Sequence, residues 1–109
     1  MKPILVLTTT DKAELASRIA SALVNAHEAA CVTIVSGVRS VYRWEGKVCE
    51  EGEWLLLIKS LDERFEAISA RIRQLHTYQV PEVVALPITS GSPDYLCWLE
   101  GQVLGSKID

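Results

Sequence analysis

Three cysteines are the most reactive side chains of this 109-residue chain, and their spacing limits what they can do. They stand far apart in the sequence, at Cys31, Cys49 and Cys97. An odd number of cysteines with such wide gaps builds neither a disulfide framework nor the paired CxxC arrangement of zinc and redox sites. We therefore expect the three thiols to be small buried hydrophobic groups that do not bind metal.

Catalytic patterns are absent from the sequence. It contains no Gly-x-Ser-x-Gly, no HExxH, no phosphate-binding glycine loop and no cysteine–histidine pair at a recognisable spacing. Because no residue stands out as a general base, we predict that the protein is not an enzyme. A group of cations could instead gather an anionic ligand, although each is equally a partner for nearby glutamates. This group consists of Arg39, Arg43, Lys47 and Lys59.

Five aromatic residues could line a ligand cleft, but side chains of this kind more often anchor a core or a subunit interface. They are Tyr42, Trp44, Trp54, Tyr78 and Trp98. We expect the core or interface role.

Charge and hydrophobicity exclude two classes of partner. The formal net charge of −3 lacks the basic surplus of a nucleic-acid-binding protein, and Glu50, Glu51 and Glu53 would repel a phosphate backbone. The chain is 49% hydrophobic, yet no apolar run approaches the roughly 18 to 20 residues that span a bilayer. No secretory signal is visible after Met1. We expect one domain over residues 1–109, a cytoplasmic location, and no binding to nucleic acid or insertion into a membrane.

The stretch from Cys31 to Ser60 is typical of one long β-hairpin. Apolar and β-branched residues fill both arms, and Glu45-Gly46 between them tolerates the positive φ angles of a tight turn. Ser36-Gly37 indicates a bulge in the first arm. In the second arm, residues 54–58 place apolar groups on both faces of the sheet, so a single layer of helices would leave one face uncovered.

Strands and helices alternate along the rest of the chain. Strand patterns cover residues 4–8 and 83–88, and helical spacing covers residues 15–26, 65–75 and 95–103. Capping boxes are expected at Asp11 with Glu14 and at Ser60 with Glu63. Ser92 should cap the last helix, with Pro93 at its first position.

This order of elements predicts an α+β fold. A β-α-β-β-α-β chain with right-handed crossovers forms an antiparallel sheet with both main helices on one face, which is the ferredoxin-like arrangement, here with an extra C-terminal helix. The uncovered face leads us to expect a homotrimer in which the hairpin strands cross the subunit boundaries.

Three sequence blocks carry a resemblance to a known family. They are AACVTIVSGV at residues 29–38, SVYRWEGK at 40–47 and HTYQVPEVVALP at 76–87. In this order they resemble the CutA divalent-cation tolerance proteins, and the likeness covers nearly the whole chain. The resemblance implies a ferredoxin-like subunit in a tight trimer, similar in architecture to the PII signalling proteins. It also implies a link to tolerance of copper and other divalent metals, without established catalysis.

The resemblance implies a metal site formed by His76 and Glu82, whose imidazole and carboxylate suit Cu(II) or Zn(II). Two ligands are too few, so water or another subunit would complete the site. The alternative role for His76 is to fix the loop by hydrogen bonding at the helix end.

Two functions follow from these observations. The first is a metal-binding protein of divalent-cation homeostasis, with copper or another divalent cation as its ligand and no cofactor required for folding. The alternative is a PII-like signalling trimer that binds a small anionic ligand in clefts between subunits.

Overall fold

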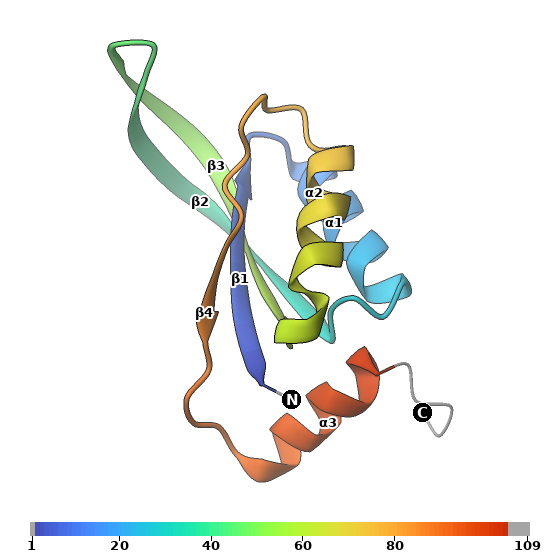
Figure 1. The fold of residues 1–109 in the computed structure, drawn as a ribbon. Helices are drawn as coiled ribbons and strands as arrows, with labels where there is room; N and C mark the ends of the chain where they lie inside the picture. The colour runs from blue at the N-terminus through green and yellow to red at the C-terminus, as the bar shows by residue number, and fades with distance from the viewer. Residues whose placement is uncertain (1, 105–109) are drawn as a thin grey trace.

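The structure is a computed structural model that describes residues 2–104, arranged as a twisted sheet with helices on one face (Figure 1). The elements follow one another as β1 (Pro3–Thr10), α1 (Ala13–Asn25), β2 (Cys31–Trp44), β3 (Lys47–Leu61), a 3-10 turn (Asp62–Arg64), α2 (Phe65–Leu75), β4 (Val84–Pro87) and α3 (Pro93–Val103).

The four strands lie in the order β2-β3-β1-β4, and every neighbouring pair is antiparallel. The first strand is therefore central, with Ile4 opposite Ser60 of β3 on one side and Pro87 of β4 on the other. Both crossovers carry their helix across the same face of the sheet (Figure 1). This arrangement confirms the ferredoxin-like α+β fold with an additional C-terminal helix.

The β2–β3 hairpin is much longer than the strand beside it. Since β1 ends at Thr10, opposite Trp54, the part of the hairpin beyond that point pairs with no third strand of the described residues. We call this part, residues 38–53, the distal ribbon. Its turn has positive φ at both Glu45 (51°) and Gly46 (81°), as the sequence predicts for a tight hairpin. The ribbon extends well beyond the helices, and the described chain measures 49 × 25 × 23 Å (Figure 1).

A β-bulge interrupts β2 where Ser36-Gly37 predicts it. Val35 pairs with Leu55, but the next pair is Val38 with Glu53, so three steps along β2 match two along β3. Gly37 takes φ +76°, a conformation that costs glycine little and other residues more.

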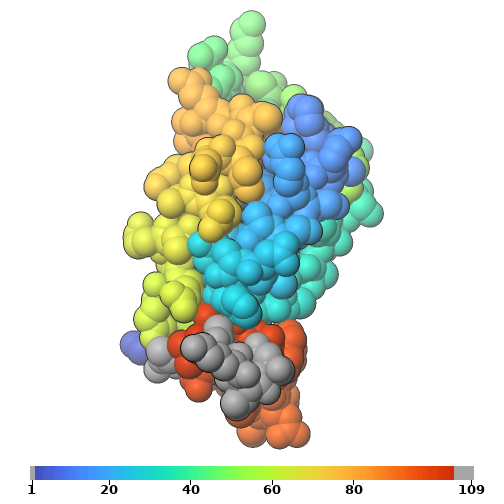
Figure 2. Space-filling model, turned by 90° about the vertical axis from the view of Figure 1, so that its right-hand side faces the viewer, coloured from blue at the N-terminus to red at the C-terminus, as the bar shows by residue number. Residues whose placement is uncertain are grey.

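The main core lies between the sheet and the two long helices. Alternate residues of β1 and β3 point toward the helices, and Val6, Leu56 and Ile58 are each 0% exposed. Apolar side chains of both helices, including Ile19 of α1 and Ile68 of α2, pack against these strand residues. Figure 2 shows this side of the molecule, with α1 and α2 packed next to each other and α3 at one end.

The opposite face of the sheet carries apolar side chains that none of the helices within residues 2–104 covers. Side chains alternate along a strand, so the residues between the core positions point to this face. The pairing of Leu5 with Leu86 and of Leu7 with Leu57 places these apolar residues side by side. We call this the open face, formed by Leu5, Leu7, Val35, Leu55, Leu57, Val84 and Leu86. The two-faced character predicted for residues 54–58 is confirmed.

Two predicted capping boxes are wrong. The first helix is preceded by Lys12, with no side-chain cap, and Asp11 instead forms an ion pair with Lys12 at 3.5 Å. Ser60 is not a cap because it remains in β3, where its hydroxyl donates to the carbonyl oxygen of Glu28 at 2.5 Å. Ser92 does precede α3, with Pro93 at the first turn, although its side chain makes no capping bond.

Candidate functional site

A pocket of about 550 Å³ lies where the distal ribbon meets the loop between α2 and β4. The ribbon and the end of β1 form one side, and loop residues 78–82 form the other. Its lining residues are Thr9, Ser40, Tyr42, Trp44, Glu53, Tyr78, Gln79, Val80, Pro81 and Glu82.

The β-bulge decides which ribbon side chains face this pocket. Side chains alternate between the two faces of a strand, so one extra residue reverses the pattern beyond it. Val35 lies on the open face, and without the bulge Val41 and Arg43 would follow on that side. With the bulge, Ser40, Tyr42 and Trp44 occupy it instead, as the pairing of Val38 with Glu53 requires. The extra residue therefore brings two aromatic rings to the pocket.

Glu53 is the buried charged residue of the pocket, with 5% of its surface exposed. The hydroxyl of Tyr78 donates to its Oε2 atom over 2.6 Å. Burial, followed by the hydrogen bond to Glu53 and its charge, raises the pKa of Tyr78 above its usual range. The phenol therefore stays protonated near neutral pH and keeps donating to the carboxylate.

A second tyrosine that lines the pocket, Tyr42, also has a raised pKa. Desolvation, followed by the charges of Glu51 and other nearby groups that include Glu53, raises the pKa of Tyr42. Among the residues that line the pocket, all within the described part of the chain, two are carboxylates and none is lysine or arginine. The pocket thus favours positive over negative ligands.

His76 lies directly after α2, and both of its ring nitrogens have hydrogen-bond partners. The backbone N–H of Tyr78 donates to Nδ1 over 3.0 Å, so the hydrogen of the neutral ring resides on Nε2. This Nε2 is 2.7 Å from the carbonyl oxygen of Thr9, which accepts the bond. The ring also packs against Tyr78, with 4.5 Å between centroids. His76 therefore ties the loop to the end of β1, the loop-fixing role that was the alternative to metal ligation.

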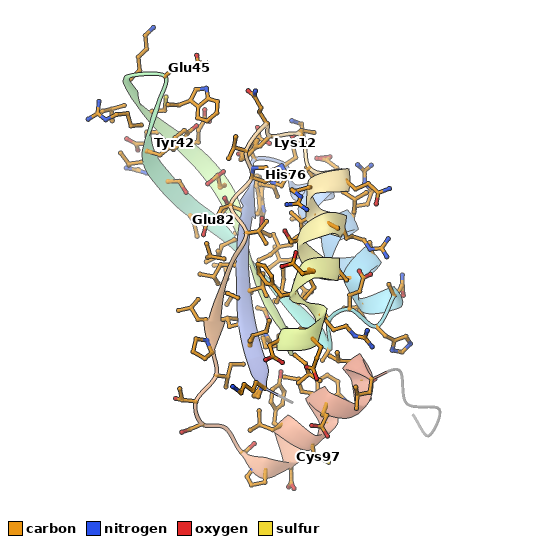
Figure 3. All side chains as sticks on the ribbon, viewed as in Figure 1. Lys12, Tyr42, Glu45, His76, Glu82 and Cys97 are labelled. Atoms are coloured by element: carbon orange, nitrogen blue, oxygen red, sulfur yellow. The ribbon has the colours of Figure 1, made fainter. Side chains whose placement is uncertain are left out.

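The two residues of the predicted metal site take different positions. Glu82 lines the pocket and is exposed, whereas His76 is not among the lining residues. Figure 3 shows His76 at the end of α2 and Glu82 on the segment that leads into β4. Within residues 2–104, no cluster of three or more histidine, cysteine, aspartate or glutamate side chains is arranged to hold a metal ion.

Three of the five aromatic residues considered from the sequence meet in the pocket, namely Tyr42, Trp44 and Tyr78. Trp54 instead packs against the main core. Trp98 lies on α3 beside Tyr95, with 5.6 Å between ring centroids.

The cations considered for an anionic ligand do not gather in the pocket. Arg39 pairs with Glu50 at 2.7 Å on the ribbon, and Nζ of Lys59 donates to the Thr33 hydroxyl at 2.6 Å. Neither residue is among those that line the pocket, and the same holds for Arg43 and Lys47.

The cysteines are free, as predicted, but the expectation that all three are buried is wrong. Cys97 is exposed because Leu99 and Val103 form the buried side of α3, and a helix turns position 97 away from both. Cys31 and Cys49 are half-buried.

From the sequence Glu53 is recognisable only as a negative charge, and its place in the pocket is not predicted. The signal that could have found it is strand alternation. Glu53 is in phase with Leu55 and Leu57, so it places a carboxylate directly at the end of the apolar run on that face.

The family comparison decides the classification. Residues 4–102 match the family model described as "CutA1 divalent ion tolerance protein". The chain belongs to this family. Its sequence is 50% identical over 94 residues to the divalent-cation tolerance protein CutA of Thermus thermophilus, covering 86% of this chain and 91% of the relative. It is 45% identical over 97 residues to a chloroplastic CutA of Arabidopsis thaliana, covering 89% of this chain but only 53% of that longer relative.

Solved structures agree with this membership in CutA1. The solved divalent cation tolerance protein (Cut A1) from Thermus thermophilus superposes with a TM-score of 0.90 at 47% identity, covering 92% of this chain and 97% of that one. The CutA1 structure from Oryza sativa gives a TM-score of 0.91 at 41% identity, with 94% of both chains covered. None of the helices in residues 2–104 is long and apolar enough to cross a membrane.

Proposed function

We propose that this CutA1 protein acts in tolerance of divalent cations, copper among them, by binding the cation beside its acidic pocket. The observation that carries the proposal is the charge of that pocket, where Glu53 and Glu82 face a space with no lysine or arginine in its lining. The names of the relatives, which are divalent-cation tolerance proteins, point to the same class of ligand.

His76 and Glu82 are the proposed ligands. Nδ1 is the ring atom with a free lone pair once the N–H of Tyr78 is displaced, and losing that hydrogen bond costs about 1 kcal/mol. Glu82 is exposed and supplies an oxygen ligand without such a cost. Two side chains do not complete the coordination shell of a divalent cation, so waters or a second subunit supply the remaining ligands.

We also propose that the protein works as a homotrimer. The open face supports this assembly, because Val84 and Leu86 are each 46% exposed next to the half-buried Leu5 and Leu7. Burying such a continuous apolar surface against other copies is the simplest way to remove it from water. Light scattering should give three times the chain mass of 12.1 kDa, and a mass of one chain would overturn the trimer.

The anionic-ligand alternative receives less support. A PII-like sensor needs free cations at its ligand site, whereas Arg39 and Lys59 are engaged by Glu50 and Thr33. The cytoplasmic location stays a prediction, since one relative is named chloroplastic and a solved CutA from Archaeoglobus fulgidus is titled periplasmic.

Titration calorimetry with Cu(II) near neutral pH tests the metal site. We expect His76→Ala to weaken binding at least tenfold, about 1.4 kcal/mol, and Glu82→Gln to weaken it less. A variant in which all three cysteines are replaced by serine serves as the control, with affinity within a few-fold of the parent. If His76→Ala binds Cu(II) as tightly as the parent, His76 is not a ligand and only its loop-fixing role remains.

A further inference from the structure

The pocket has features that a metal site does not need. Its volume of about 550 Å³ is within the range of small-molecule sites, which runs from about 300 to 1,000 Å³. Its walls include the rings of Tyr42, Trp44 and Tyr78, which the proposed imidazole and carboxylate ligation of a divalent cation does not use. The bulge at Gly37 turns two of these rings to this side.

The carboxylate of Glu53 is fixed and incompletely satisfied. It is 5% exposed, and the bond from Tyr78 to Oε2 is the one hydrogen bond that its side chain makes with other described residues. A carboxylate accepts up to four hydrogen bonds, so acceptor capacity remains at Oε1. A buried charge without an opposite charge beside it is costly, and a cation arriving in the pocket would offset that cost.

Aromatic faces and carboxylates together define one class of ligand. Ring faces attract ammonium and guanidinium groups, and they do so more strongly when water is excluded. The carboxylates bind the same groups by charge-assisted hydrogen bonds. An anion would be repelled by Glu53 and Glu82, and a neutral apolar molecule would leave Glu53 without an opposite charge beside it.

We propose that this pocket binds a small organic ammonium ion, such as an aliphatic diamine, between the rings of Tyr42, Trp44 and Tyr78 with its charge on Glu53. A second ammonium group meets Glu82, which is exposed on the loop side of the same pocket. This activity goes beyond the binding of divalent cations, because the rings and Glu53 take part in ammonium binding alone and His76 in metal binding alone, whereas Glu82 is common to both.

The test is calorimetry of the full-length protein in metal-free buffer of low ionic strength, with 1,4-diaminobutane as the probe. The matched control ligand is 1,4-butanediol, which has the same length and no charge. We expect saturable binding of the diamine and none of the diol. High salt should weaken the diamine complex, since part of the attraction is between charges.

Three variants locate the binding. Trp44→Leu should weaken diamine binding about threefold or more, the effect of losing one cation–π contact. Glu53→Gln keeps an acceptor for the Tyr78 hydroxyl but removes the charge, and should weaken binding about tenfold or more. Trp98→Leu, an exposed aromatic residue on α3, is the matched control and should leave the affinity unchanged.

The outcomes separate this inference from the metal site. Equal affinity for diamine and diol, no diamine binding at all, or undiminished binding by both Trp44→Leu and Glu53→Gln would each overturn it. Cu(II) titration of Trp44→Leu should match the parent, and Cu(II) titration of His76→Ala reports on the metal proposal alone. Loss of diamine binding therefore does not contradict the metal proposal, and loss of Cu(II) binding does not contradict the diamine proposal.

Discussion

The two faces of the sheet use the same kinds of residues in different ways. On the helix face, Leu56 and Ile58 are fully buried within one chain, and the core is complete. On the open face, Leu55 and Leu57 alternate with them but remain half-buried, and the neighbour of Leu57 across the sheet is the apolar Leu7. The helix face thus provides what the chain needs to fold, whereas the open face carries apolar surface that a single copy does not cover. Adjacent residues of one strand therefore serve folding and assembly separately.

The largest effect should come from a charge on the helix face. Leu56→Glu places a carboxylate at a position of 0% exposure with no opposite charge to pair with, which we expect to cost about 4 kcal/mol or more. The fold should be lost or severely weakened, as measured by circular dichroism and urea unfolding.

Leu57→Glu is the matched change on the open face. It should leave the circular dichroism of the chain native-like but reduce the mass in light scattering toward 12.1 kDa. Val24→Glu, at an apolar residue of α1 that is 40% exposed, controls for an added charge and should change neither property. If Leu56→Glu and Leu57→Glu behave alike, the two faces do not differ as we argue.

A smaller effect is expected at Glu53, a polar residue on the same side of β3 as the open face. Tyr78→Phe removes the donor to buried Glu53, and we expect a loss of about 1 to 3 kcal/mol in urea unfolding near neutral pH. Because the folded pKa of Tyr78 is raised, its stabilising contribution is complete below the unfolded value near 10 and is lost as pH rises beyond it. The parent should therefore lose stability more steeply than Tyr78→Phe above about pH 10. Parallel alkaline profiles for the two proteins would contradict this assignment.

The smallest effect concerns the bulge that assigns ribbon residues to their faces. Gly37→Ala meets no atom within 4 Å, so its cost arises from the backbone at φ +76° alone, about 1 kcal/mol. Gly52→Ala, a position in β3 without positive φ and equally open, is the control and should not destabilise the protein. Equal urea midpoints for the two variants would show that the bulge conformation is not strained for alanine.

Local signals predicted the hairpin well. Glu45-Gly46 and Ser36-Gly37 are short motifs whose backbone demands do not depend on distant residues, so the turn and the bulge follow from them. The caps failed because tertiary contacts outweigh local preference, as where Ser60 is held in β3 by its bond to Glu28.

The candidate site could be predicted only in part. His76 and Glu82 were recognisable from the family pattern, and Tyr42, Trp44 and Tyr78 as aromatic candidates. Their meeting with Glu53 depends on the register of β2 against β3 and on the path of the loop after α2, neither of which the sequence specifies. The hydrogen bonds of His76 with Thr9 and Tyr78 likewise depend on the folded structure, so the sequence does not predict them.

The central position of β1 sets an order for folding during synthesis. This strand leaves the ribosome before both of its partners, which end only at Leu61 in β3 and Pro87 in β4. Its apolar run at residues 4–7 must therefore wait, unpaired, while most of the chain is made. The β2–β3 hairpin is local and forms within microseconds, whereas inserting β1 between two distant strands closes long loops and comes late. Nascent chains halted before residue 61 should accordingly be prone to aggregation through their first strand.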